Sequence, residues 1–110
     1  MSADVYLDIP ACDSCGRSAA TVADMNLTYN LTPMLRGAGM PPWDEFVGMD
    51  AHDAAGIWEG VVEELERDPE LYDSLNPQNG WGSRLLAVQN LTKFAKQCRD
   101  VKKGTISAWL

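Results

Sequence analysis

The chain lacks several features that would assign it to a membrane, a secretion route or a familiar class of enzyme. No run approaches the roughly 20 apolar residues of a membrane span, and residues 1–8 carry acids where a signal peptide has basic and then apolar residues. The sequence has one histidine, His52, and contains no G-x-S-x-G, H-E-x-x-H or phosphate-binding loop. We therefore expect a cytoplasmic protein without a membrane partner, and binding is favoured over catalysis.

Basic residues are also scarce and unevenly placed. Nine Lys and Arg stand against sixteen Asp and Glu, which gives a net charge of −7. Eleven of the acids lie between residues 43 and 76, where Arg67 is the single base, whereas six of the bases follow Trp81. This small basic footprint disfavours direct nucleic-acid binding. Either two oppositely charged helices neutralise each other, or an acidic helical surface binds a host or phage protein with a basic surface.

The composition of the chain is typical of one globular domain. The chain has 110 residues, 45% of them hydrophobic, and four tryptophans. Chains that stay disordered lack this much apolar and aromatic surface. The length suits a single domain over residues 1–110 and leaves no room for a second.

Hydrophobic periodicity predicts an α+β fold. Alternating apolar residues predict strands at residues 4–9, 21–31 and 105–110, and apolar residues at three- and four-residue steps predict helices at 33–38, 51–67, 69–75 and 84–99. Thr32, Asp50, Asp68 and Ser83 are the expected helix caps. We therefore expect three or four helices to cover one face of a small antiparallel three-stranded sheet.

The cysteines suggest a metal site only in part. Cys12 and Cys15 have the C-x-x-C spacing of half a zinc site, and the remaining ligands would have to be His52 and Cys98. However, His52 stands near an exposed helix start, and Cys98 belongs to an apolar stripe. The favoured interpretation is a turn with two free thiols and no cofactor, and a structural zinc and a redox pair are the alternatives.

Candidate binding residues lie on the second predicted strand and on one loop. Asn26, Thr28 and Asn30 form a polar row that could hydrogen-bond a ligand or an added strand. Trp81, between two glycines of "NPQNGWGS", either closes the end of the core or anchors an interaction. The competing hypothesis is a small enzyme or ligand-binding protein whose site uses Tyr29, Asn30, His52 and Trp81.

Three stretches carry a family resemblance. "NLTYNLTPMLRGAG", "LERDPELYDSLNPQNGWGS" and a helix ending in "KQC" resemble a set of small uncharacterised proteins from actinobacterial phages and some bacteria. The resemblance covers residues 22–98, and its most specific parts are the N-x-T-x-N strand and the P-x-N-G-W-G loop. It implies a phage accessory protein in a reduced bacterial cytoplasm, and it implies no reaction and no functional residues.

Overall fold

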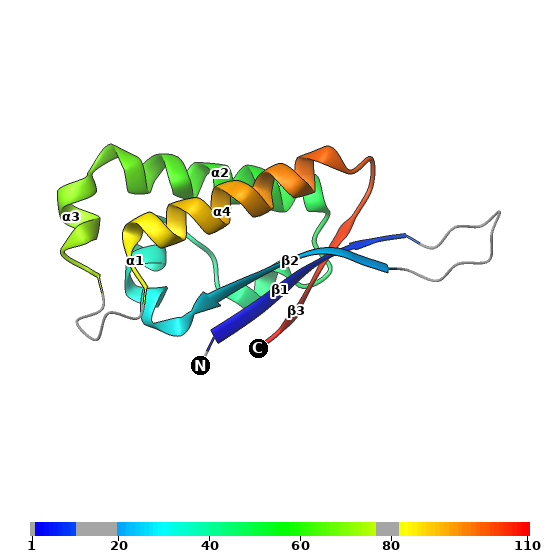
Figure 1. Ribbon diagram of the computed structural model, residues 1–110, viewed down its shortest axis with the longest axis horizontal. Coiled ribbons are helices and arrows are strands. Elements are labelled where there is room, and N and C mark those ends of the chain that lie inside the picture. Colours follow the sequence, from blue (N-terminus) through cyan, green and yellow to red (C-terminus); the bar gives the residue numbers. More distant parts are fainter. Residues whose placement is uncertain (1, 11–19, 77–81) are drawn as a thin grey trace.

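The computed structural model describes residues 2–10, 20–76 and 82–110, and in this part of the chain three strands form an antiparallel sheet. β1 (Ser2–Ile9) lies in the middle, between β2 (Ala20–Thr28) and β3 (Thr105–Trp109). The start of β1 and the end of β3 consequently lie close together (Figure 1). The α+β class and the three-stranded antiparallel sheet are confirmed.

The inner face of the sheet forms one side of the core. Val5 pairs with Met25 on β2 and with Ala108 on β3, and Leu7 pairs with Ile106. Val5, Leu7, Met25 and Ile106 are buried. Because side chains alternate between the two faces of a strand, the residues between them lie on the opposite face, called the outer face below.

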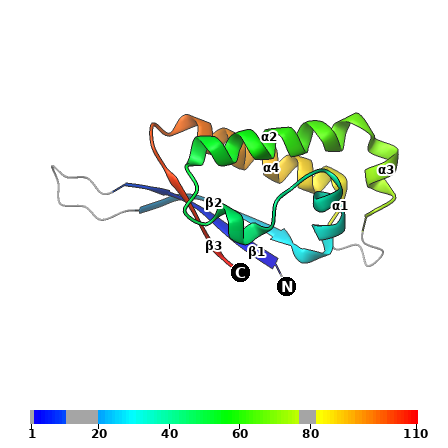
Figure 2. The ribbon, with the colours of Figure 1, turned by 180° about the vertical axis from the view of Figure 1, so that it is seen from behind.

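The two long helices cover the inner face. α2 (Ala51–Arg67) and α4 (Arg84–Asp100) run antiparallel and side by side, as Figures 1 and 2 show from opposite sides. α1 (Thr32–Gly37) and α3 (Pro69–Asp73) lie at the same end of the molecule. No helix in the described ranges is long and apolar enough to span a membrane.

An aromatic stack joins the helices in the core. Trp58 on α2 lies between Phe46 and Phe94, with ring centroids 4.9 and 5.3 Å away. Phe46 belongs to a short 3₁₀ helix, η2 (Trp43–Phe46), and the chain after it hydrogen-bonds along the free edge of β3, from Gly48 N to Ile106 O at 2.8 Å. The three rings are all buried, so η2, α2 and α4 are held around one apolar centre.

Three of the four predicted helix caps are confirmed. The side chains of Asp50, Asp68 and Ser83 accept hydrogen bonds from backbone N–H groups in the first turns of α2, α3 and α4. The prediction for Thr32 is wrong. A 3₁₀ helix, η1 (Tyr29–Leu31), runs directly into α1, so Leu31 already has helical backbone angles and Thr32 is the first residue of the helix.

The second strand ends three residues before its predicted end. The predicted strand covered residues 21–31, but β2 ends at Thr28, whose side chain accepts a hydrogen bond from the backbone N–H of Asn30. This bond caps η1, and a helical turn replaces the extended backbone that the alternating sequence suggested. Asn30 therefore does not continue the polar row of Asn26 and Thr28.

Candidate interaction surface

The outer face of the sheet is not covered by the helices that the structure describes, since α2 and α4 lie on the inner face (Figures 1 and 2). The outer-face residues are, in strand order, Ser2, Asp4, Tyr6, Asp8, Thr21, Asp24, Asn26, Thr28, Thr105, Ser107 and Trp109. The three described strands contain three aspartates and no lysine or arginine. As far as the described residues go, the outer face is consequently open, polar and negatively charged.

Hydrogen bonds across the strands hold two of these carboxylates in place. Asn26 donates its side-chain amide to Asp4 Oδ1 at 2.6 Å and to Ser2 Oγ at 2.8 Å. Asp8 accepts from the hydroxyls of Thr21 at 2.6 Å and Ser107 at 2.7 Å. These donors orient the carboxylates without neutralising their charge, so the outer face presents fixed acceptors.

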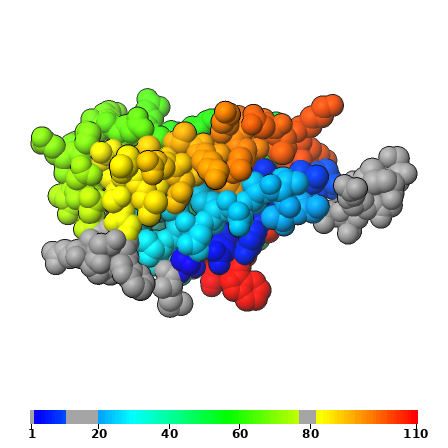
Figure 3. Space-filling model, in the orientation of Figure 1, coloured from blue at the N-terminus to red at the C-terminus, as the bar shows by residue number. Residues whose placement is uncertain are grey.

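Aromatic side chains lie among the carboxylates. Trp109 is 76% exposed, and it pairs directly with Asp4 across β1 and β3. Tyr6 lies half-buried on the central strand, opposite Asp24 on β2. The end of β3 projects from the surface of the molecule (Figure 3). From the sequence, Trp109 can be identified only as part of a strand, because its position opposite an aspartate depends on which strand becomes its neighbour.

The acidic helical surface is partly neutralised. Arg99 on α4 donates two hydrogen bonds to Glu59 on α2, at 2.6 and 3.3 Å, and these bonds hold the pKa of the Glu59 carboxyl below its usual value. Arg84 pairs with Asp73 at 2.8 Å, and Arg67 pairs with Glu64 within α2. The first of the two charge interpretations, mutual neutralisation of the helices, therefore describes part of this surface.

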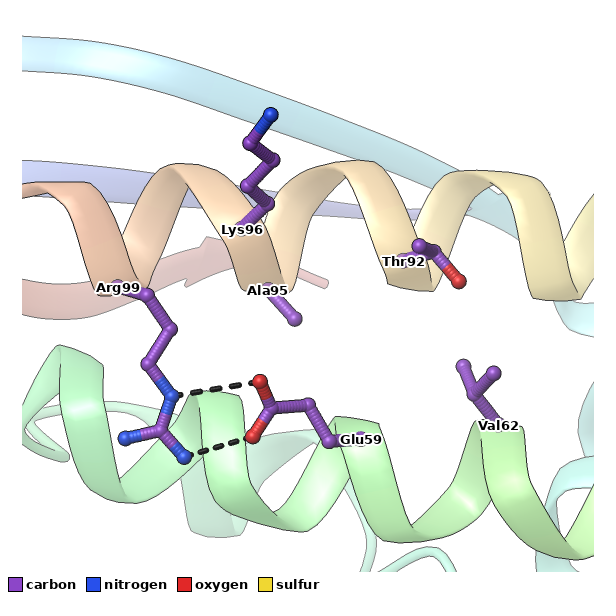
Figure 4. A pocket seen from close by; sticks show the side chains of 6 residues that line it. All are labelled: Glu59, Val62, Thr92, Ala95, Lys96 and Arg99. Carbon is purple, nitrogen blue, oxygen red and sulfur yellow. Dashed lines mark hydrogen bonds and ion pairs between the residues drawn. The ribbon is translucent and has the colours of Figure 1, made fainter.

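A shallow groove of about 290 Å³ runs between α2 and α4. Its lining residues are Glu59, Val62, Thr92, Ala95, Lys96 and Arg99 (Figure 4). Figure 4 shows Glu59 and Arg99 pointing toward each other across it, whereas Lys96 points away. Because the guanidinium is already bonded to Glu59, the groove offers a ligand mainly apolar walls.

Of the proposed zinc ligands, the structure describes His52 and Cys98. His52 Nε2 lies 2.7 Å from the backbone oxygen of Val101. Cys98 is fully buried on α4, and burial raises the pKa of its thiol to about 11, so that it stays protonated at neutral pH. Zinc binds the thiolate, and within the described ranges no three His, Cys, Asp or Glu side chains are grouped to hold a metal. Cys12 and Cys15 lie outside the described residues.

The residues of the predicted enzyme or ligand site are not brought together. His52 contacts the chain just after the end of α4, whereas η1, with Tyr29 and Asn30, packs near its start, where Gly82 adjoins Leu31. A 17-residue helix separates these two points by about 25 Å. Trp81 lies outside the described residues.

No protein family, curated protein or solved structure was found to match the chain.

Proposed function

We propose that this protein is a non-enzymatic interaction module that binds a basic protein partner over the outer face of its sheet. The resemblance noted above suggests the setting, a phage-type accessory protein that blocks a host protein in the bacterial cytoplasm. The observation that carries the proposal is the outer face itself, which has fixed aspartates, no basic residue in its strands and one largely exposed tryptophan.

A comparison of the two charged surfaces supports the outer face over the acidic helical surface, which was one of the two interpretations of the charge pattern. On the helices, Arg99, Arg84 and Arg67 compensate three of the carboxylates. On the outer face, the donors to Asp4 and Asp8 among the described residues are neutral, so these hydrogen bonds leave the negative charge in place. A field of one sign over an uncovered surface speeds encounter with an oppositely charged partner and selects against like-charged ones.

A charge-matched pair of variants tests this assignment. Asp4→Asn/Asp24→Asn removes two charges from the outer face, and Glu63→Gln/Glu66→Gln removes two exposed charges from α2. Binding of a 12-residue peptide with two arginines and two lysines would be measured by calorimetry for both variants and the unmodified protein. We expect the outer-face variant alone to lose most of the affinity, and the affinity to fall with added salt.

Two results would contradict the proposal. Loss of binding in the α2 variant, with the outer-face variant unaffected, would return the site to the helices. Equal and small losses in both variants would mean that the peptide responds only to net charge. Thermal unfolding of both variants shows whether a loss of affinity merely reflects unfolding, and surface changes of this kind normally alter stability by no more than about 0.5 kcal/mol.

A further inference from the structure

The pairing register on the outer face indicates which type of side chain a partner would place there. Asp4 on the central strand pairs with Asn26 on one side and with Trp109 on the other. Side chains directly opposite each other in an antiparallel pair have Cβ atoms about 5 Å apart. A carboxylate and an exposed indole are therefore neighbours on an open surface, and the carboxylate is held from the far side by the Asn26 amide.

The hydrogen-bond pattern leaves room at this carboxylate for a ligand. The Asn26 amide occupies Asp4 Oδ1, and none of the other described residues donates a hydrogen bond to Oδ2. The indole beside it is 76% exposed. A ligand group at this point would thus meet an aromatic surface together with a carboxylate oxygen that no described residue occupies.

We propose that the outer face receives an arginine of an extended segment of the partner protein, with its guanidinium against Trp109 and hydrogen-bonded to Asp4. This proposal rests on the function proposed above. The guanidinium is flat, stacks on aromatic rings and donates to carboxylates through a fixed fork of N–H groups. A lysine ammonium is more strongly hydrated and has no flat face, so lysine fits this pair of groups less well.

The strand spacing defines the rest of the segment. Asp8 lies four residues from Asp4 along β1, a distance of about 13 Å. An extended peptide has the same rise per residue, so a second arginine four residues after the first lies over Asp8. Both oxygens of Asp8 already accept hydrogen bonds from Thr21 and Ser107, so this second contact depends on charge attraction. Asp24, opposite Tyr6, lies between these positions on β2. The expected occupant is therefore an extended segment with arginines at positions i and i+4.

The test uses three peptides that differ only at those two positions, which carry arginine, lysine or the neutral isostere citrulline. Affinities would be measured by calorimetry with the unmodified protein and with Trp109→Ala, Trp109→Phe, Asp4→Asn and Glu63→Gln. We expect the arginine peptide to bind about tenfold more tightly than the lysine peptide, and the citrulline peptide not to bind. Trp109→Ala and Asp4→Asn should each weaken the arginine peptide about tenfold, Trp109→Phe should retain part of the affinity, and Glu63→Gln should have no effect.

The outcomes separate this inference from the function on which it rests. If the arginine and lysine peptides bind equally and Trp109→Ala changes nothing, while Asp4→Asn/Asp24→Asn abolishes binding, the arginine site is wrong and the basic partner stands. If no peptide binds the folded protein, both proposals fail. Concentration-dependent self-association, seen by analytical ultracentrifugation and abolished by Trp109→Ala, would show that a second copy occupies the outer face and would overturn the arginine site.

Discussion

Replacing Cys98 tests whether its thiol is a protonated core group, as its burial indicates, or the thiolate that a zinc site would need. Cys98 is fully buried, and burial raises the pKa of its thiol from 9.0 to about 11. In the unfolded chain the thiol titrates near 9, so between pH 9 and 11 the unfolded state loses a proton that the folded state keeps. The stability contributed by this group is complete below pH 9 and is lost as the pH rises toward 11.

The size of the effect follows from the shift. One pKa unit corresponds to about 1.4 kcal/mol, so the free energy of unfolding should fall by up to about 1.4 kcal/mol per pH unit and by about 2.7 kcal/mol in total. Lysines and tyrosines titrate over the same range, so the measured quantity is the difference between the unmodified protein and Cys98→Ala. The alanine variant also loses packing in the core, which lowers its free energy of unfolding by the same amount at every pH. This constant loss does not change how the difference between the two proteins varies with pH.

The assay is urea unfolding followed by tryptophan fluorescence, from pH 7.5 to 10.5 with a reductant present. We expect a constant difference in stability up to about pH 8.5 and a decline above it. A difference that does not change with pH would refute the desolvated thiol, and one that grows with pH would indicate a stabilised thiolate such as a metal ligand. In a Cys12→Ser/Cys15→Ser background, Cys98 should react with a thiol reagent only after urea is added.

Three further predictions concern the fold that presents the outer face. Gly82→Ala should destabilise by about 1–3 kcal/mol in urea, because φ is +107° and a Cβ would lie 3.1 Å from Leu31; an unchanged midpoint would contradict this geometry. Asp50→Ala should cost about 1 kcal/mol in thermal unfolding through loss of the α2 cap, whereas Asp50→Asn should cost little, and equal effects of the two changes would argue against capping. Glu59→Gln should flatten the acid side of the stability profile: the carboxyl's lowered pKa stabilises the fold above its usual pKa, and that stability is lost as the pH falls through the lowered value. If the stability of Glu59→Gln falls as steeply at acid pH as that of the unmodified protein, other carboxyls cause the loss of stability in acid.

Most of the secondary structure could be predicted because local rules dominated it. The helix at residues 51–67 was predicted with the bounds that α2 has, since Asp50 caps it and its apolar residues recur at helical spacing. The strand that became β2 was extended too far, because alternation alone does not reveal a side-chain hydrogen bond such as that from Asn30 N–H to Thr28.

The candidate site could be predicted only in part. Asn26 and Thr28 were correctly placed together on a strand face, but the partners of the Asn26 amide, Asp4 and Ser2, come from 22 and 24 residues away. Thr21 should have faced inward by alternation with Ala23, yet an irregularity in the register between Leu7 and Asp8 turns it to the outer face, where it bonds Asp8. Such a bulge leaves no local sequence signal.

The sequence by itself determined the elements, their caps and the excess of acid, because these depend on residue type and on spacing over a few positions. Only the tertiary structure decided that β1 is central, which places Trp109 beside Asp4, and that Arg99 meets Glu59 across the helices. The physical reason is that pairing between distant segments is selected by burial of the whole inner face. The charges on the outer face are thus brought together by the apolar residues on the opposite side of the sheet.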